Sequence, residues 1–407
     1  MSPSDAMRPQ IDRAQKRALS LGVLGVIGVV VWGFVDVHRV GHGWQPFFQS
    51  YLFAFVFMVS FPLGCLGFLM MHHLTGGPWG LPIRRILEAG TRTLWLAAVL
   101  SIPVLIASLH GGANALFPWT QPGQIPDDAV NHFKRIYLQP GFFILRAIIY
   151  FAIWAIIAHL LNKWSAEQDR TADLAPAKMA KMSSLSGPGL VIWSLTVGAA
   201  AVDWVMSLEP RWYSTIWGML FMVIMALAGL TFSIVVLRTL SNEAPLKDCV
   251  RPKDYNDLGN LVLAFTLLWT YMSFSQFLII WSGNLKDEIP WYTIRARGPW
   301  GGVAVILLLF HFFLPFFVLL QRRVKRRLAS LSIVAAWMLI LTLIDIFWLV
   351  APAYEQNAPQ FRLMDVLAVI GVGGLWLAAF YSQLAKLPLL PLHDPRFESF
   401  LEHQHGD

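Results

Sequence analysis

The chain has 407 residues, of which 56% are hydrophobic and only 14% are charged, whereas soluble domains carry about 25% charged residues. This shortage of charge excludes an ordinary soluble domain. The net charge of +7 resides mainly in short segments between apolar runs. It therefore indicates how the chain lies in a membrane and excludes nucleic acid as its partner.

Ten apolar runs are long enough to cross the hydrocarbon core of a bilayer, which takes about 20 residues. In chain order they are residues 19–35, 47–71, 93–109, 142–161, 190–208, 216–237, 258–281, 301–320, 328–350 and 364–384. Basic residues precede the first run, but no small-residue cleavage site follows it, so we expect an uncleaved span and not a secretory signal. The sequence predicts an all-α polytopic membrane protein with ten transmembrane helices.

The distribution of basic residues predicts the orientation of these helices. Most of the 31 lysines and arginines lie between the spans on the side of the N-terminus. The short loop 322–327 is almost entirely basic, which is typical of a cytoplasmic turn under the positive-inside rule. Ten spans place both ends of the chain on one side, so we expect both termini in the cytoplasm.

A weak internal repeat relates the two halves of the chain, because pairs of polar or Pro residues recur at equal spacing. The matching pairs are Asp203 and Pro210 with Asp345 and Pro352, and Pro140 and Asn162 with Pro299 and Gln321. We therefore expect a single membrane domain (1–407) with two similar four-helix bundles, formed by spans 2–5 (37–211) and spans 6–9 (212–351). Spans 1 and 10 with their tails (1–36 and 352–407) are expected at the periphery, and the halves should share one topology.

Two carboxylates lie deep inside predicted spans, Asp203 in the fifth and Asp345 in the ninth. A carboxylate deep in a membrane is costly and commonly faces a cavity, a charged partner or a proton path. One interpretation is a proton relay in the outer half of the membrane. The other is a structural hydrogen bond to a neighbouring helix, or an ion pair with Arg146, which is itself inside the fourth span.

His311 in the eighth span is followed four residues later by Pro315, which has no N–H to donate to the His311 carbonyl. A carbonyl without its helical partner and an imidazole would then share one site near the middle of the membrane. This combination suits a proton carrier, a water molecule or a quinone headgroup. A histidine that is merely hydrogen-bonded in a Pro-kinked helix gives the same pattern.

Further histidines end predicted spans on the cytoplasmic side: His72 and His73 end the second span, and His159 ends the fourth. They could form a cytoplasmic proton entrance, or simply lie in water. The two cysteines, Cys65 and Cys249, are isolated, and no haem-attachment or iron–sulfur spacing occurs. We expect no metal or haem in this chain.

Two longer motifs carry a resemblance. Residues 203–215 read DWVMSLEPRWYST, and residues 272–285 read MSFSQFLIIWSGNL with EIPWY following at 288–292. In these motifs the chain resembles the ActF family, the second membrane subunit of bacterial alternative complex III. That family is part of the wider NrfD and polysulfide-reductase membrane family, and the resemblance extends to the length and number of spans.

The resemblance implies a subunit of a quinol:cytochrome c (or cupredoxin) oxidoreductase of the respiratory chain, in the bacterial cytoplasmic membrane. It implies as partners a homologous membrane subunit that oxidises quinol, an outer-facing iron–sulfur subunit and multihaem cytochrome c subunits. Iron–sulfur clusters and c-type haems would belong to those partners, and quinol is a candidate ligand of this chain. Catalysis would then be a property of the complex.

One residue departs from the related pattern. In the sister subunit a His follows the Trp of the first motif, where this chain has Tyr213. Tyrosine has a reference pKa of about 10 and is a poor base at neutral pH. We therefore expect no catalytic residue here but a proton path formed by Asp203, Asp345, His311, Glu209 and Tyr213. The alternatives are a secondary transporter with two parallel repeats, or the membrane anchor of another NrfD-type oxidoreductase.

Overall fold

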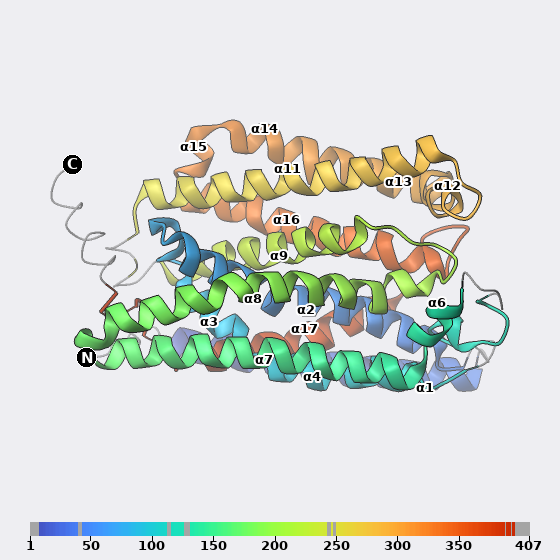
Figure 1. Cartoon of the computed structure of the whole chain (residues 1–407), viewed down its shortest axis with the longest axis horizontal. Coiled ribbons are helices and arrows are strands. Elements are labelled where there is room, and N and C mark those ends of the chain that lie inside the picture. The colour runs from blue at the N-terminus through green and yellow to red at the C-terminus, as the bar shows by residue number, and fades with distance from the viewer. Residues whose placement is uncertain are drawn as a thin grey trace.

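The structure is a computed structural model that describes residues 8–39, 43–111, 115–125, 131–241, 246, 250–386, 388–391 and 393–394. Long helices run side by side along the longest axis of the molecule (Figure 1). The first-half helices are α1 (Arg8–Arg39), α2 (Gln45–Thr75), α3 (Arg84–Thr91), α4 (Leu94–Leu100), α5 (Ile102–Ala107), α6 (His132–Tyr137), α7 (Pro140–Arg170) and α8 (Ala175–Trp204). The later helices are α9 (Trp217–Leu240), α11 (Pro252–Gly283), α12 (Ile289–Ala296), α13 (Gly298–Ile306), α14 (Leu314–Leu320), α15 (Arg322–Lys325), α16 (Leu328–Val350) and α17 (Leu363–Leu384).

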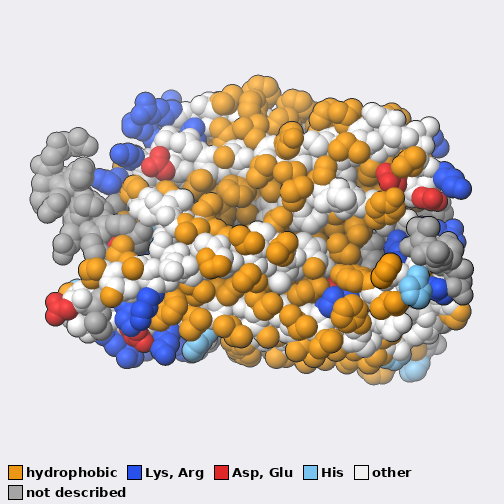
Figure 2. All heavy atoms as spheres, in the orientation of Figure 1, with side chains coloured by type: hydrophobic (Ala, Val, Ile, Leu, Met, Phe, Trp, Pro, Cys, Tyr) orange, Lys and Arg blue, Asp and Glu red, His pale blue; other side chains and the backbone are white. Residues whose placement is uncertain are grey.

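The predicted all-α membrane fold is confirmed. Within the part of the chain that the structure describes, 10 helical segments are long and apolar enough to cross a membrane. Hydrophobic side chains cover most of the middle of the face drawn in Figure 2, while Lys and Arg gather toward the ends of the helices. The basic α15 lies at one end of the bundle, and α6 and α12 lie at the other, which we call the α6 end (Figure 1).

The third span differs from the continuous helix that the sequence predicts at 93–109. It begins at Arg84 and is divided into α3, α4 and α5. Pro103 lies in the first turn of α5, where a residue without an N–H is tolerated. Proline cannot donate the backbone hydrogen bond that would continue α4 into α5. The span therefore consists of three short helices, whereas its counterpart in the second half, α11, is a single helix of 32 residues.

Glycines bring α1 and α17 into backbone contact, as their sequence positions indicate. A Cβ atom added to Gly25 would lie 2.4 Å from the backbone nitrogen of Gly371, and one added to Gly22 would lie 2.5 Å from that of Leu375. Helix α17 then packs on α2. Spans 1 and 10 are thereby fixed to the side of the first predicted bundle.

The first helices of the two predicted bundles, α2 and α9, cross at the centre of the molecule. Their backbones meet at Gly64 and Gly229, and a Cβ atom at Gly64 would lie 1.9 Å from the carbonyl oxygen of Met225. Around this crossing α2 packs on α8, and α9 packs on α16. The helices that carry Asp203 and Asp345 are therefore both held against the central pair.

Candidate functional site

The carboxylate of Asp203 is bound by an arginine within the membrane. Asp203 is at the end of α8, and Arg146 is in the second turn of α7. The Arg146 guanidinium donates from Nε to Oδ2 over 2.9 Å and from Nη2 to Oδ1 over 2.8 Å. Asp203 is 1% exposed and Arg146 is 7% exposed. Two parallel hydrogen bonds of this kind fix the position of the Asp203 carboxylate and favour its ionised form.

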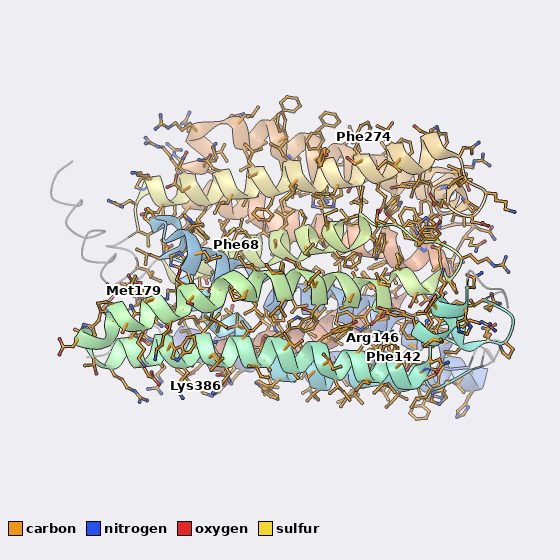
Figure 3. The ribbon with its side chains drawn as sticks, in the orientation of Figure 1. Phe68, Phe142, Arg146, Met179, Phe274 and Lys386 are labelled. Atoms are coloured by element: carbon orange, nitrogen blue, oxygen red, sulfur yellow. The ribbon has the colours of Figure 1, made fainter. Side chains whose placement is uncertain are left out.

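Neighbouring residues complete this ion pair. The Tyr150 hydroxyl donates to Asp203 Oδ2 over 3.0 Å, and Arg146 Nη1 donates to the Tyr137 carbonyl over 2.7 Å. The guanidinium also lies over the rings of Tyr137 and Phe142, at 3.7 and 4.6 Å from their centroids; Figure 3 labels Arg146 and Phe142 on α7. Of the two interpretations of Asp203, these contacts favour the structural pair, and its part in a proton path stays a prediction.

Asp345 has a different environment. It is 3% exposed in α16, and its Oδ2 accepts a hydrogen bond of 2.9 Å from the indole Nε1 of Trp269 in α11. No described residue forms an ion pair with Asp345. Its carboxylate is therefore held by one neutral donor, without a compensating positive charge.

The same indole contacts His311. The ring centroids of Trp269 and His311 are 4.3 Å apart, so one indole contacts both Asp345 and His311. His311 is 1% exposed, and neither ring nitrogen has a hydrogen-bond partner among the described residues. Such a buried polar group is uncommon in native structures and calls for a physical explanation.

The backbone around His311 is not a regular α-helix. Residues Leu307–Phe313 form a π-helical turn, η5, in which the N–H of Leu314 donates to the carbonyl of Leu309. Pro315 follows in the first turn of α14 and has no N–H to donate to the preceding turn. The Phe310 carbonyl accepts a hydrogen bond of 3.0 Å from Trp337 Nε1. A carbonyl of His311 without its helical partner stays a prediction.

Glu209 and Tyr213 have other contacts than the two aspartates, and their part in a proton path stays a prediction. Glu209 accepts a hydrogen bond of 2.7 Å from Arg295 of α12, which also donates to the carbonyl of Leu349 over 3.1 Å. Arg295 is 1% exposed, and burial lowers the pKa of its guanidinium despite the neighbouring Glu209. Tyr213 is 53% exposed. Glu209 therefore ties the end of the first bundle to the second.

The two sequence motifs meet in space at this end of the molecule. Ser214 of the first motif donates to Gln276 Oε1 over 2.9 Å, and Gln276 Nε2 donates to the hydroxyl of Tyr292 over 3.2 Å. The rings of Trp212 and Trp291 are stacked with centroids 4.7 Å apart. The motifs thus form one junction between the bundles at the α6 end.

The three histidines at the other end are not all neighbours. His72 and His73 lie in the last turn of α2 with ring centroids 5.8 Å apart, and His72 contacts the ring of Trp79 at 5.5 Å. His159 is exposed on α7, which continues to Arg170. The first two histidines can form one site, and His159 lies outside it.

A buried ionic cluster that the sequence reasoning missed lies at the α15 end; we call it the inner hub. Arg84 and Arg85 of α3 donate to Glu88 over 2.9 and 2.6 Å. Arg84 also donates to Asp394 over 2.6 Å, and Arg85 to Asp169 over 2.5 Å. The only sequence signal was the basic pair followed by an acid at helical spacing. These charges compensate one another, which favours a structural role.

Among the described residues, no group of three or more His, Cys, Asp or Glu side chains has a geometry that could hold a metal ion. Cys65 is buried and reduced in α2, and Cys249 lies outside the described residues. The absence of a metal or haem from this chain stays a prediction.

Comparison of the sequence with protein-family models and with curated proteins gives no match. The fold therefore defines the class by itself: this is a multi-pass, all-α membrane protein.

Proposed function

We propose that the chain is an integral membrane subunit of a quinol:cytochrome c (or cupredoxin) oxidoreductase, and that its second bundle carries protons. The observation that supports the proton role is the contact of Trp269 with both Asp345 and His311. An intramembrane carboxylate without a cationic partner and a buried imidazole without a hydrogen-bond partner are the two groups expected of a relay. Trp269 would fix the carboxylate while leaving both groups able to exchange a proton.

The remaining parts of this proposal rest on the motifs and on charge. The partners would be a homologous membrane subunit, an iron–sulfur subunit and multihaem cytochrome c subunits, in a bacterial cytoplasmic membrane. The basic α15 end would face the cytoplasm, and the α6 end, where the motifs meet, would face the electron-accepting partners. Quinol oxidation would take place in the homologous subunit.

The arrangement of helix interruptions favours this proposal over a secondary transporter. Transporters with repeated halves place broken helices at corresponding positions around a shared site. Here the third span is divided and its counterpart α11 is continuous, while the π-helical turn η5 interrupts the eighth span and its counterpart α7 is continuous. The membrane anchor of another NrfD-type oxidoreductase would have the same proton groups, and the cofactors that copurify with the chain distinguish the two.

The proton role is tested in liposomes that contain the whole complex. Asp345→Asn should lower the number of protons released per electron while quinol affinity and haem content stay unchanged, because the amide keeps the shape and the acceptor for Trp269 but cannot titrate. Asp287→Asn, in an exposed loop, is the matched control. If Asp345→Asn weakens quinol affinity and leaves proton release normal, the second bundle binds substrate and the proposal is wrong.

The orientation is tested separately. A cysteine in place of Arg323, which is exposed on α15, should react with a membrane-impermeant maleimide only after the cells are opened. A cysteine in place of Lys286, exposed after α11, should react in intact cells. The reverse pattern of labelling would invert the proposed topology.

A further inference from the structure

An apolar groove lies at the α6 end, outside the proposed proton site. Its volume is about 470 Å³, which is in the range of about 300–1,000 Å³ that small-molecule sites occupy. Helix α6, the first turn of α7 and the segment after α8 form its walls, with Phe133, Tyr137, Phe142, Met206 and Trp212 among the lining residues. An apolar cavity of this shape accepts a hydrocarbon chain.

Among the described residues that line the groove, Lys134 is the only one with a charged side chain. It forms no ion pair with any described residue, and its ammonium nitrogen lies 5.9 Å from the centroid of the Tyr213 ring. Partial burial lowers the pKa of Lys134. Arg146, behind Tyr137 and Phe142, is already neutralised by Asp203. Among the described residues, the mouth of the groove therefore carries one uncompensated positive charge.

The groove lies at the α6 end of two helices that are long and apolar enough to cross a membrane. It is bounded by the first turn of α7 and by the end of α8, two membrane-spanning helices. Helix α6 exposes Phe133 and Ile136, whose exposed fractions are 80% and 47%, and carries Lys134 and Arg135 in its last turn. Exposed apolar residues beside basic ones are typical of a helix that lies in the membrane interface.

We propose that this groove binds an anionic phospholipid of the bilayer, with one acyl chain along Phe142 and Met206 and the phosphate beside Lys134. Charge complementarity selects this occupant: a neutral quinol fills the apolar part but leaves the lysine uncompensated, and a zwitterionic lipid compensates it less. The inference does not depend on the proposed proton function, because none of the groove residues belongs to the Asp345 cluster.

The probe is phosphatidylglycerol added to the purified complex in detergent, with retained lipid counted by native mass spectrometry. Lys134→Gln should weaken phosphatidylglycerol retention about fivefold, the effect expected of one basic residue at a membrane surface. It should not alter the weaker retention of phosphatidylcholine. Met206→Trp, which fills the groove, should reduce retention of both lipids. Lys286→Gln, an exposed lysine outside the groove, should behave as the unaltered chain.

Three results would overturn the proposal. The first is unchanged phosphatidylglycerol retention in both Lys134→Gln and Met206→Trp. The second is equal retention of phosphatidylglycerol and phosphatidylcholine by the unaltered chain, since charge would then play no part. The third is displacement of bound lipid by a short-chain quinol at equimolar concentration, which would assign the groove to quinol.

Discussion

Asp203 and Asp345 occupy matching places in the two halves of the chain, yet the groups that surround them differ in charge. Asp203 is bound by the guanidinium of Arg146, whereas Asp345 is bound by the indole of Trp269. Counted from the Pro that begins each preceding span, the position of Arg146 corresponds to Val305, which is 54% exposed. The second half therefore has no arginine at the place where the first half uses one.

This difference separates two uses of a membrane carboxylate. A bidentate arginine holds the carboxylate ionised and immobile, so that neither a proton nor a ligand is needed to compensate it. A single neutral donor fixes the position of the carboxylate but leaves its charge to be set by protons. The first arrangement suits a joint between helices, and the second suits a site that changes its protonation state.

The largest effect is expected from breaking the arginine pair. Arg146→Met leaves Asp203 buried without a cation, and should destabilise the chain by about 3–5 kcal/mol. The double variant Arg146→Met/Asp203→Leu should recover most of this loss, because apolar pairs of similar volume replace buried ion pairs well. Unfolding of the purified chain with a denaturing detergent measures both values. Equal losses in the single and double variants would show that the pair is not the cause.

The crossing of α2 and α9 that joins the halves can be disturbed by one methyl group. Gly64→Ala places a Cβ atom against the Met225 carbonyl and should cost about 1–3 kcal/mol, the usual range for overpacking. Gly373→Ala in α17 is the matched control, because an added Cβ there meets nothing within 4 Å. The control should be neutral or slightly stabilising, since alanine favours helix. Similar values for the two variants would contradict close contact at the crossing.

A smaller effect is expected when the indole that donates a hydrogen bond to Asp345 is removed. Trp269→Phe removes the hydrogen bond to Asp345 but keeps an aromatic ring beside His311, and should cost about 1–2 kcal/mol. Trp154→Phe is a control in the first half, where the indole donates to the hydroxyl of Thr196 and not to a carboxylate. If proton release by the complex changes in Trp154→Phe and not in Trp269→Phe, the proposal that the second half carries protons is wrong.

The smallest change in stability should come from Asp345→Asn, at less than about 1 kcal/mol, because the amide oxygen still accepts from Trp269. Asp203→Asn, by contrast, leaves Arg146 uncompensated and should cost as much as Arg146→Met. The difference between these two equivalent substitutions measures the contrast between the halves directly. Equal costs would show that both carboxylates are structural.

Sequence reasoning predicted the spans because burial in hydrocarbon imposes a long apolar run on every helix. It also named Arg146 as a partner of Asp203, since both are charged groups inside predicted spans. It did not find Trp269 or Arg295. The hydrogen bonds of these residues join positions 76 and 86 residues apart, and no local pattern specifies which helices become neighbours.

The π-helical turn at His311 was missed for a different reason. An apolar run such as 307–313 is compatible with an α-helix and with a π-helix, because both form their backbone hydrogen bonds within the segment. Pro315 indicated that the backbone hydrogen bonds are interrupted near His311, but it did not indicate a π-helical turn. The form of the interruption therefore required the backbone itself.

The inner hub has a consequence for the order in which the protein is made. Arg84 and Asp394 are separated by 310 residues, so the ribosome adds 310 residues after Arg84 before the last acid of the hub exists. Until then Arg84 lacks one of its buried anions, an arrangement that a membrane tolerates poorly. The first bundle therefore completes its buried ionic contacts only after the second bundle has been synthesised.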